Sequence, residues 1–168
     1  QSTPETIHVV EASSFQLETT TSFRPWIAVW LNVSDDHLDR HPTVEAYASA
    51  KARVFANQTA ADWAVLNADD PAVMEQGRRT AARRVLFSLA GSISDGFLVD
   101  GDWIVHRTGT DVERLIRSNV SRSSLSERAR CSTNLASNSK ATGFSVSLSF
   151  TVSVFELSTV LMVSVLAS

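Results

Sequence analysis

Four short apolar runs in the first 90 residues, separated by polar and helix-forming stretches, constrain the fold of this chain most strongly. The runs are Ile7–Val10, Trp26–Val33, Trp63–Leu66 and Val85–Ser88. Trp26–Val33 is continuous rather than alternating, which favours a strand that is covered on both faces. Strands that alternate with helices build βαβ units, so the pattern predicts an α/β fold with a mostly parallel sheet flanked by helices.

The stretches between the apolar runs carry helix and turn signals. Thr43 has the side chain of an N-cap and predicts a helix over roughly 44–57. A second helix is expected around 72–83, and residues 15–18 are compatible with a short one. Asp100-Gly101 separates two further apolar runs and predicts a β-hairpin over about 97–107.

The composition of the chain changes near residue 117. From residue 118 on, 15 of 51 residues are serine, whereas the 117 residues before contain nine. We therefore expect a globular body over 1–117 and an irregular Ser-rich tail over 118–168. Apolar and hydroxyl residues alternate over Phe144–Val154, which is a strand pattern. The same stretch makes a poor membrane segment because serines interrupt it.

Charge and cysteine content exclude several classes of function. The formal net charge is −3, so we expect no nucleic-acid partner, which would normally require a basic face. The single cysteine, Cys131, excludes an intrachain disulfide framework and a multi-cysteine zinc site, and it fits a reducing compartment. Residues 1–10 have no secretory-signal pattern. We therefore expect a cytoplasmic protein without a membrane partner. We also expect a monomer.

Lys51 is the strongest candidate for chemistry in the predicted helices. Val44, Tyr47, Lys51 and Phe55 have the spacing of one helical face. A lysine on such an apolar face either extends its amine to solvent, which is the commoner outcome, or is partly desolvated. Desolvation lowers the pKa of an amine, and the neutral amine can act as a nucleophile or take up carbon dioxide as a carbamate.

Acidic and histidine side chains follow two of the predicted strands. Ligands of parallel sheets bind beyond the carboxyl ends of the strands, where Glu11–Ser14 and Ser34–His41 are expected. His37 and His41 have the spacing to share a metal ion if they are helical. Their segment lacks the glutamate of the zinc-protease pattern, and an acid-rich loop is more often a solvated turn. The sequence has no phosphate-loop, dinucleotide-binding or nucleophile-elbow motif.

Several segments stand in a fixed order along the chain: Glu11–Glu18 with its Ser-Ser-Phe-Gln-Leu-Glu run, then Leu31–His41, Tyr47–Phe55 and Asn67–Pro71. Together they resemble the central domain of the Mur ligase family. The likeness is strong over residues 7–71, looser to about 117 and then lost. The Ser-Ser-Phe-Gln run is most similar to the branch of the family that adds D-glutamate.

The resemblance implies an ATP-dependent ligase of peptidoglycan synthesis, which serves cell-wall growth, cell shape and cell division. The family activates the terminal carboxylate of its UDP-sugar substrate as an acyl phosphate. In the branch that adds D-glutamate, this substrate is UDP-N-acetylmuramoyl-L-alanine, and the amine of D-glutamate attacks the acyl phosphate. Two Mg²⁺ ions offset the phosphate charge. By resemblance, Glu11 is a magnesium ligand, His37 binds the second magnesium, Lys51 is the carbamylated catalytic lysine that also serves that ion, and Ser13 contacts the UDP-sugar substrate.

The resemblance also sets an expectation about activity. It places the ATP-binding loop of the family ahead of the Glu11 segment, so we expect a fragment that does not turn over ATP by itself. The alternative is a non-catalytic binding module or a gene remnant without a role. Our hypothesis for the tail is a frame change or misjoined segment after about Arg117. Ligase-like sequence in a neighbouring reading frame of the coding DNA would support it, and its absence would refute it.

Overall fold

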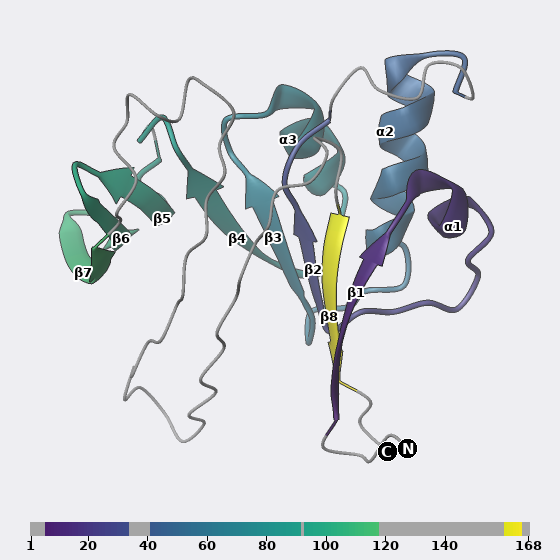
Figure 1. Ribbon diagram of the computed structural model, residues 1–168, viewed down its shortest axis with the longest axis horizontal. Helices are drawn as coiled ribbons and strands as arrows, with labels where there is room; N and C mark the ends of the chain where they lie inside the picture. Colours follow the sequence, from purple (N-terminus) through teal and green to yellow (C-terminus); the bar gives the residue numbers. More distant parts are fainter. Residues whose placement is uncertain (1–5, 34–40, 92, 118–159, 166–168) are drawn as a thin grey trace. The chain divides into compact units, whose positions relative to one another are not determined.

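The computed structural model describes residues 6–33, 41–91 and 93–117, together with the backbone of residues 160–165 (Figure 1). These residues belong to two compact units. The first unit lies within residues 1–87 and 156–168, and the second lies within residues 88–155.

A sheet forms the centre of the first unit. Its strands, in order across the sheet, are β1 (Ile7–Ala12), β8 (Val160–Val165), β2 (Ile27–Trp30), β3 (Trp63–Asn67) and β4 (Arg83–Ser88). β2, β3 and β4 pair in parallel, whereas β8 runs antiparallel to both β1 and β2. The α/β fold with a mostly parallel sheet, predicted from the apolar runs, is therefore confirmed.

The expectation of an irregular tail is wrong at residues 160–165, which form β8. The local sequence Val-Leu-Met-Val-Ser-Val favours an extended backbone, and the two neighbouring strands supply pairing partners on both sides. Local sequence alone does not reveal such partners, because they lie more than 100 residues away. The strand predicted over 144–154 falls outside the described residues.

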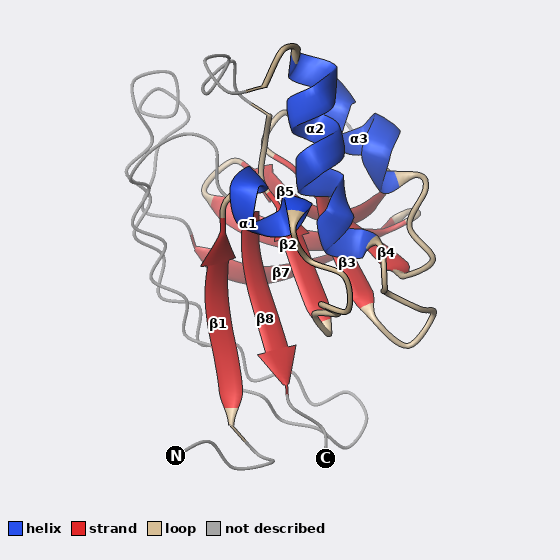
Figure 2. Ribbon diagram, turned by 90° about the vertical axis from the view of Figure 1, so that its right-hand side faces the viewer, coloured by secondary structure: helices blue, strands red, loops and turns tan. Residues whose placement is uncertain are grey.

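Three short α-helices and one 3₁₀ turn connect the strands and lie over one face of the sheet (Figure 2). They are α1 (Ser14–Glu18), α2 (Val44–Ala52), η1 (Arg53–Phe55) and α3 (Pro71–Gly77). The Thr43 hydroxyl accepts a hydrogen bond from the Ala46 amide at 3.1 Å, which confirms the predicted N-cap of α2. No helix among the described residues is long and apolar enough to cross a membrane.

Two helices are shorter than the sequence predicted. The helix expected over 44–57 changes to a 3₁₀ turn after Ala52. The helix expected over 72–83 ends at Gly77, because the chain must reverse before β4 begins at Arg83. A Cβ atom on Gly77 would overlap the side chain of Leu66 in β3, so glycine allows the end of α3 to pack closely on the sheet.

The core of the first unit lies between the helices and one face of the sheet. On β2, Ala28 and Trp30 are fully buried, whereas Ile27 and Val29 on the opposite face are only partly buried. The predicted cover on both faces is therefore complete on the face that the helices pack against and partial on the other. The remaining core residues are Ala12, Leu17, Ala48, Val54, Phe55, Ala64, Leu66, Val73 and Ala82.

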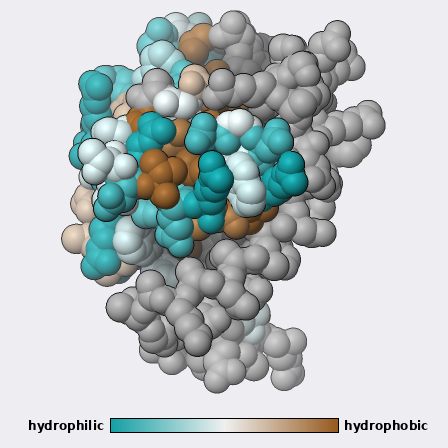
Figure 3. Space-filling view, turned by 90° about the vertical axis from the view of Figure 1, so that its left-hand side faces the viewer, coloured by the Kyte–Doolittle hydropathy of each residue, from teal (hydrophilic) through white to brown (hydrophobic). Residues whose placement is uncertain are grey.

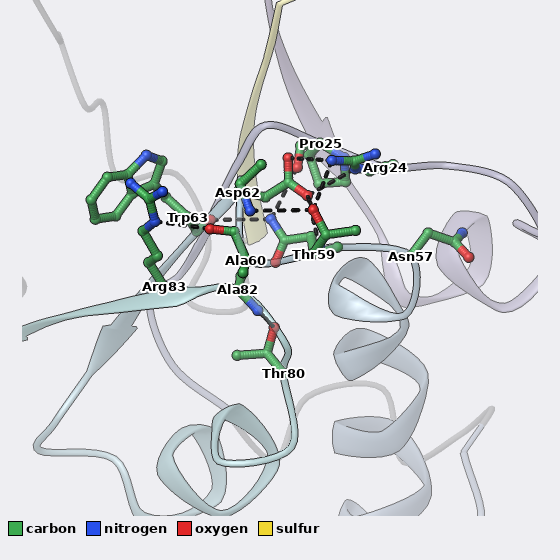
Figure 4. Close-up of polar contacts among 12 residues, drawn as sticks. Arg24, Pro25, Asn57, Thr59, Ala60, Asp62, Trp63, Thr80, Ala82 and Arg83 are labelled. Carbon is green, nitrogen blue, oxygen red and sulfur yellow. Dashed lines mark hydrogen bonds and ion pairs between the residues drawn. The ribbon is translucent and has the colours of Figure 1, made fainter.

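A polar network fixes the amino ends of the strands (Figure 4). The Arg24 guanidinium donates to both carboxylate oxygens of Asp62, at 2.8 and 3.2 Å, and the Thr59 amide donates to Asp62 at 2.7 Å. Burial alone raises the pKa of Asp62, but the hydrogen bonds from Arg24 and Thr59 lower it below its usual value. Arg83 Nε donates to the Ala60 carbonyl at 2.8 Å. These contacts stabilise the end of the sheet opposite the candidate site.

The second unit is an antiparallel meander of β5 (Asp95–Asp100), β6 (Trp103–Thr108) and β7 (Asp111–Arg117). Gly101, with φ of 57°, lies in the turn between β5 and β6, which confirms the predicted hairpin. β7 was not predicted; Gly109, with φ of 61°, marks the turn that precedes it. On the face drawn in Figure 3, most described residues are hydrophilic and surround a smaller apolar group.

Candidate functional site

The carboxyl ends of β1, β2 and β3 lie at one edge of the sheet, because these strands run in the same direction. Hydrogen bonds join the segments that leave β2 and β3. The Asn67 side-chain amide donates to the Leu31 carbonyl at 2.8 Å, and the Val33 amide donates to the Asp70 carboxylate at 2.7 Å. Ligands of open parallel sheets bind at this edge. The candidate site therefore lies at this edge of the sheet.

Lys51 is buried beneath this edge, with only 1% of its surface exposed. Burial lowers the pKa of its amine from 10.5 to about 8, although the negative charges of Asp70 and Glu11 act in the opposite direction. Its Nζ atom lies 4.7 Å from the centre of the Tyr47 ring, which is a cation–π contact. The structure thus decides between the two alternatives for Lys51: the amine is desolvated and does not extend to solvent.

Ser13 is the N-cap of α1 and is exposed at the same edge. Its hydroxyl accepts a hydrogen bond from the Gln16 amide at 3.3 Å, and its own amide donates to the Gln16 side chain at 2.9 Å. This capping box holds the segment that directly follows Glu11 and β1. Ser13 is therefore positioned by local contacts, while its exposure leaves it accessible to a ligand.

His41 has a different environment from the one that a shared metal site with His37 would require. His41 is buried, with its Nε2 atom 3.0 Å from the Ser14 hydroxyl and its Nδ1 atom 3.5 Å from the Glu18 carboxylate. Its ring stacks on Phe15 at 5.6 Å. Both ring nitrogens thus face α1, so the hypothesis of a metal ion shared by the two histidines fails for His41. His37 lies outside the described residues.

The chemistry of this edge fits a hard cation such as Mg²⁺. Glu11 and Asp70 carry carboxylates close enough to shift the pKa of Lys51, and a carbamate on Lys51 would add two oxygen atoms. The described residues contain no group of three or more His, Cys, Asp or Glu side chains that could hold a metal ion. A cation bound here would need further ligands, such as the oxygens of a carbamate on Lys51.

Sequence reasoning did not single out Asp70 as a site residue. Asp70 caps α3 by accepting hydrogen bonds from the Ala72 and Val73 amides at 2.9 and 3.1 Å, and its other oxygen receives the Val33 amide. The sequence carries two signals for it: its position directly before Pro71, which is typical of an N-cap, and its place in the Asn67–Pro71 segment that resembles the family. Its proximity to Lys51 follows from the packing of α2 beside α3.

Comparison with known proteins identifies the family. The Mur ligase middle domain matches residues 2–146, which extends past residue 117. The UDP-N-acetylmuramoylalanine--D-glutamate ligase of Pelotomaculum thermopropionicum is 44% identical over 115 residues, covering 68% of this chain and 25% of that protein. The ligase of the same name from Geobacillus kaustophilus is 49% identical over 107 residues, covering 64% and 24%. This chain therefore spans about a quarter of the length of these relatives, and it belongs to the Mur ligase family.

Proposed function

We propose that this chain carries part of the magnesium and substrate site of an ATP-dependent ligase that joins D-glutamate to UDP-N-acetylmuramoyl-L-alanine. The observation that supports this most directly is the desolvated Lys51 amine at the carboxyl edge of the sheet, close to Glu11 and Asp70. The described residues of the proposed site all lie within 1–117, the region that composition separates from the Ser-rich residues 118–168. The proposed location is the cytoplasm.

In the proposed reaction, the substrate carboxylate attacks the γ-phosphorus of ATP, and ADP leaves. The amine of D-glutamate then attacks the acyl phosphate, and an amide, inorganic phosphate and a proton are released. Bound Mg²⁺ would offset the negative charge of the phosphoryl groups. Glu11, His37 and carbamylated Lys51 are the proposed residues that hold the two ions, and Ser13 is the proposed contact of the UDP-sugar.

The low pKa of Lys51 makes the proposed carbamate accessible. With a pKa of about 8, roughly one Lys51 amine in ten is neutral at pH 7, whereas an ordinary lysine is neutral in fewer than about one in a thousand. The neutral nitrogen forms a bond to carbon dioxide, and a proton leaves. The product carries two oxygens and a negative charge, so a buried cationic amine becomes an anionic magnesium ligand.

Carbamylation of Lys51 provides the direct test. With ¹³C-bicarbonate at pH 8, we expect a carbamate carbon signal in the NMR spectrum of the full chain. The chain contains only two lysines, so Lys140→Arg is a matched control that is expected to keep the signal, and Lys51→Arg is expected to lose it. The α-amino group of the chain can also form a carbamate at this pH, so the test is the signal that disappears on substitution. A folded Lys51→Arg variant whose carbamate signals equal those of the unsubstituted chain would refute the proposed role of Lys51.

The same measurement tests the proposed magnesium ligand. Mg²⁺ is expected to strengthen the carbamate signal of the unsubstituted chain, because it stabilises the anion, and to strengthen it less in Glu11→Gln. An equal response of both proteins to Mg²⁺ would exclude Glu11 as a ligand. The NMR signal does not depend on turnover, so the result stands whether or not the chain is active alone.

Two measurements test the proposed substrate contact of Ser13 and the proposed inactivity of the chain on its own. Titration calorimetry with UDP-N-acetylmuramoyl-L-alanine is expected to show binding that weakens in Ser13→Gly, a change that costs the helix cap only a few tenths of a kcal/mol. Phosphate release with this substrate, D-glutamate and ATP is expected to stay at background. Sustained turnover would refute the proposed inactivity, whereas the absence of binding would favour a remnant over a binding module.

A further inference from the structure

Two asparagine side chains lie where strands end at the carboxyl edge of the first unit, and their environments differ. Asn67 is the last residue of β3, and Asn32 lies two residues beyond the end of β2. Both polar atoms of the Asn67 side chain are paired: its nitrogen donates to the Leu31 carbonyl at 2.8 Å, and its oxygen accepts from the Asp69 amide at 2.9 Å. Asn32 Oδ1, by contrast, is buried and has no hydrogen-bond partner among the described residues.

The backbone around Asn32 is held on both sides, although its Oδ1 atom lacks a partner in the described part of the chain. Trp30 Nε1 donates to the Asn32 carbonyl at 3.0 Å, and the amide of Val33 donates to the Asp70 carboxylate at 2.7 Å. A buried acceptor without a donor costs free energy, because folding removes its hydrogen bonds to water. Native proteins pair the great majority of such atoms, so the exception calls for a partner that a bound water, ion or ligand supplies.

Asn32 adjoins the charges that surround Lys51. The residue after it, Val33, donates its amide to Asp70. The carboxylates of Asp70 and Glu11 are the charges that act on the Lys51 amine. Asp70 already accepts three backbone amides, at 2.7, 2.9 and 3.1 Å, so it supplies negative charge but has little capacity left to bind an ion. A cation drawn to this edge therefore needs oxygen ligands from other residues.

The chemistry of an amide oxygen restricts what can pair with it. Asn32 Oδ1 accepts hydrogen bonds and cannot donate them, so phosphate and carboxylate oxygens, which are acceptors too, are poor partners. Hard cations bind asparagine carbonyl oxygens directly, together with carboxylates. The negative charges of Glu11 and Asp70 also favour a cation at this edge. A divalent cation therefore satisfies both the unpaired oxygen and the local charge.

We propose that Asn32 Oδ1 is a ligand of the proposed magnesium site, in addition to Glu11 and the carbamate of Lys51. The role of Asn32 rests on the proposed function, because the cation is the one that the ligase reaction would use. A neutral ligand holds the ion without cancelling its charge, which stays available to offset the phosphoryl groups. The ion would supply the partner that Oδ1 lacks among the described residues.

Cation binding to the full chain tests the proposal. Mn²⁺ is the probe, because its free hydrated ion gives an EPR signal that is lost on binding and because it prefers the same oxygen ligands as Mg²⁺. With bicarbonate present, we expect Asn32→Leu, which removes the oxygen at similar size, to bind Mn²⁺ about tenfold more weakly or worse. Asn32→Asp keeps an oxygen at the same position and is expected to bind at least as tightly as the unsubstituted chain. Glu11→Gln is the reference for the loss of another proposed ligand.

The outcomes separate the role of Asn32 from the proposed site as a whole. If Asn32→Leu binds Mn²⁺ as tightly as the unsubstituted chain while Glu11→Gln binds it more weakly, the proposal for Asn32 is overturned and the magnesium site stands. Weak binding by Asn32→Asp would also overturn it, because that variant retains the oxygen. If the unsubstituted chain itself does not bind Mn²⁺, both the role of Asn32 and the proposed magnesium site fail.

Urea unfolding distinguishes a ligand from a structural residue. Without divalent cations or bicarbonate, Asn32→Leu is expected to unfold at the same or a higher urea concentration, because it removes a buried oxygen without a partner. Asn67→Leu is the matched control and is expected to unfold at a lower concentration, because both of its polar atoms are paired. Mg²⁺ with bicarbonate is expected to raise the midpoint of the unsubstituted chain more than that of Asn32→Leu. A lower midpoint for Asn32→Leu in cation-free buffer, with an undiminished response to Mg²⁺, would assign Oδ1 to a structural water and overturn the proposal.

Discussion

Replacement of Lys51 by methionine is expected to stabilise the folded chain by up to about 3 kcal/mol at pH 7. The Lys51 amine is desolvated and its pKa falls from 10.5 to about 8 in the folded state. Below pH 8 the folded chain must hold this buried amine charged, which costs free energy that an unbranched apolar side chain of similar length avoids. Urea unfolding followed by tryptophan fluorescence measures the difference.

The sign of the pH dependence follows from proton binding. Between pH 8 and 10.5 the unfolded chain binds more protons at Lys51 than the folded chain does, so the free energy of unfolding rises with pH. The advantage of Lys51→Met is therefore full below pH 8 and disappears as the pH approaches 10.5. A difference between the two proteins that does not vary with pH would contradict this account.

Two controls isolate the effect of burial at Lys51. Lys140→Met removes the only other lysine, and so it controls for the loss of one positive charge. Both proteins are measured in buffers free of bicarbonate, because a carbamate on Lys51 would convert the cation to an anion. Addition of bicarbonate then tests the proposed modification: it is expected to change the stability of the unsubstituted chain and to leave Lys51→Met unaffected.

Replacement of His41 by alanine is expected to destabilise the chain by about 3 kcal/mol, through a cavity and a buried Ser14 hydroxyl without its partner. His41 is 3% exposed and contacts Ser14, Glu18, Phe15 and Tyr47. It therefore joins α1, which begins after Ser13, to the first turn of α2. Urea unfolding measures the loss, and faster hydrogen exchange in α1 is expected to accompany it.

A second variant separates the two contributions at His41. His41→Phe keeps a ring that can stack on Phe15 but removes the hydrogen bond to Ser14, so it is expected to cost about 1–3 kcal/mol. Arg78→Ala is the surface control, because its exposed ion pair with Glu75 is worth less than about 1 kcal/mol. If His41→Ala unfolds at the same urea concentration as the unsubstituted chain, the buried contacts of His41 do not stabilise the fold.

The elements that the sequence predicted well depend on neighbouring residues. The N-cap of α2 at Thr43 needs only the amide of Ala46, three residues along the chain. The hairpin at Asp100-Gly101 needs only a glycine that adopts positive φ between two apolar runs. Two strands were harder to predict from the sequence. β7 is mostly exposed and contains only three apolar residues, and β8 lies in a segment expected to be irregular.

The environment of the site residues could be determined only from the tertiary structure. Periodicity placed Lys51 on an apolar helix face, but whether its amine reaches solvent depends on what packs against α2. The spacing of His37 and His41 suggested a shared metal ion. In the structure, the His41 ring instead forms a hydrogen bond with Ser14, which lies 27 residues earlier in the chain. The roles of Glu11, His37 and Ser13 stay predictions.

The sequence alone determined the fold class, the positions of most helices and strands, the hairpin and the resemblance to the Mur ligases. These properties follow from residue spacing and from contacts within a few positions along the chain, which the sequence displays directly. Only the tertiary structure decided that Lys51 is desolvated beside Glu11 and Asp70, that His41 is bound to α1, and that residues 160–165 separate β1 from β2. Those properties depend on which distant segments pack together, because burial and strand pairing are set by neighbours in space.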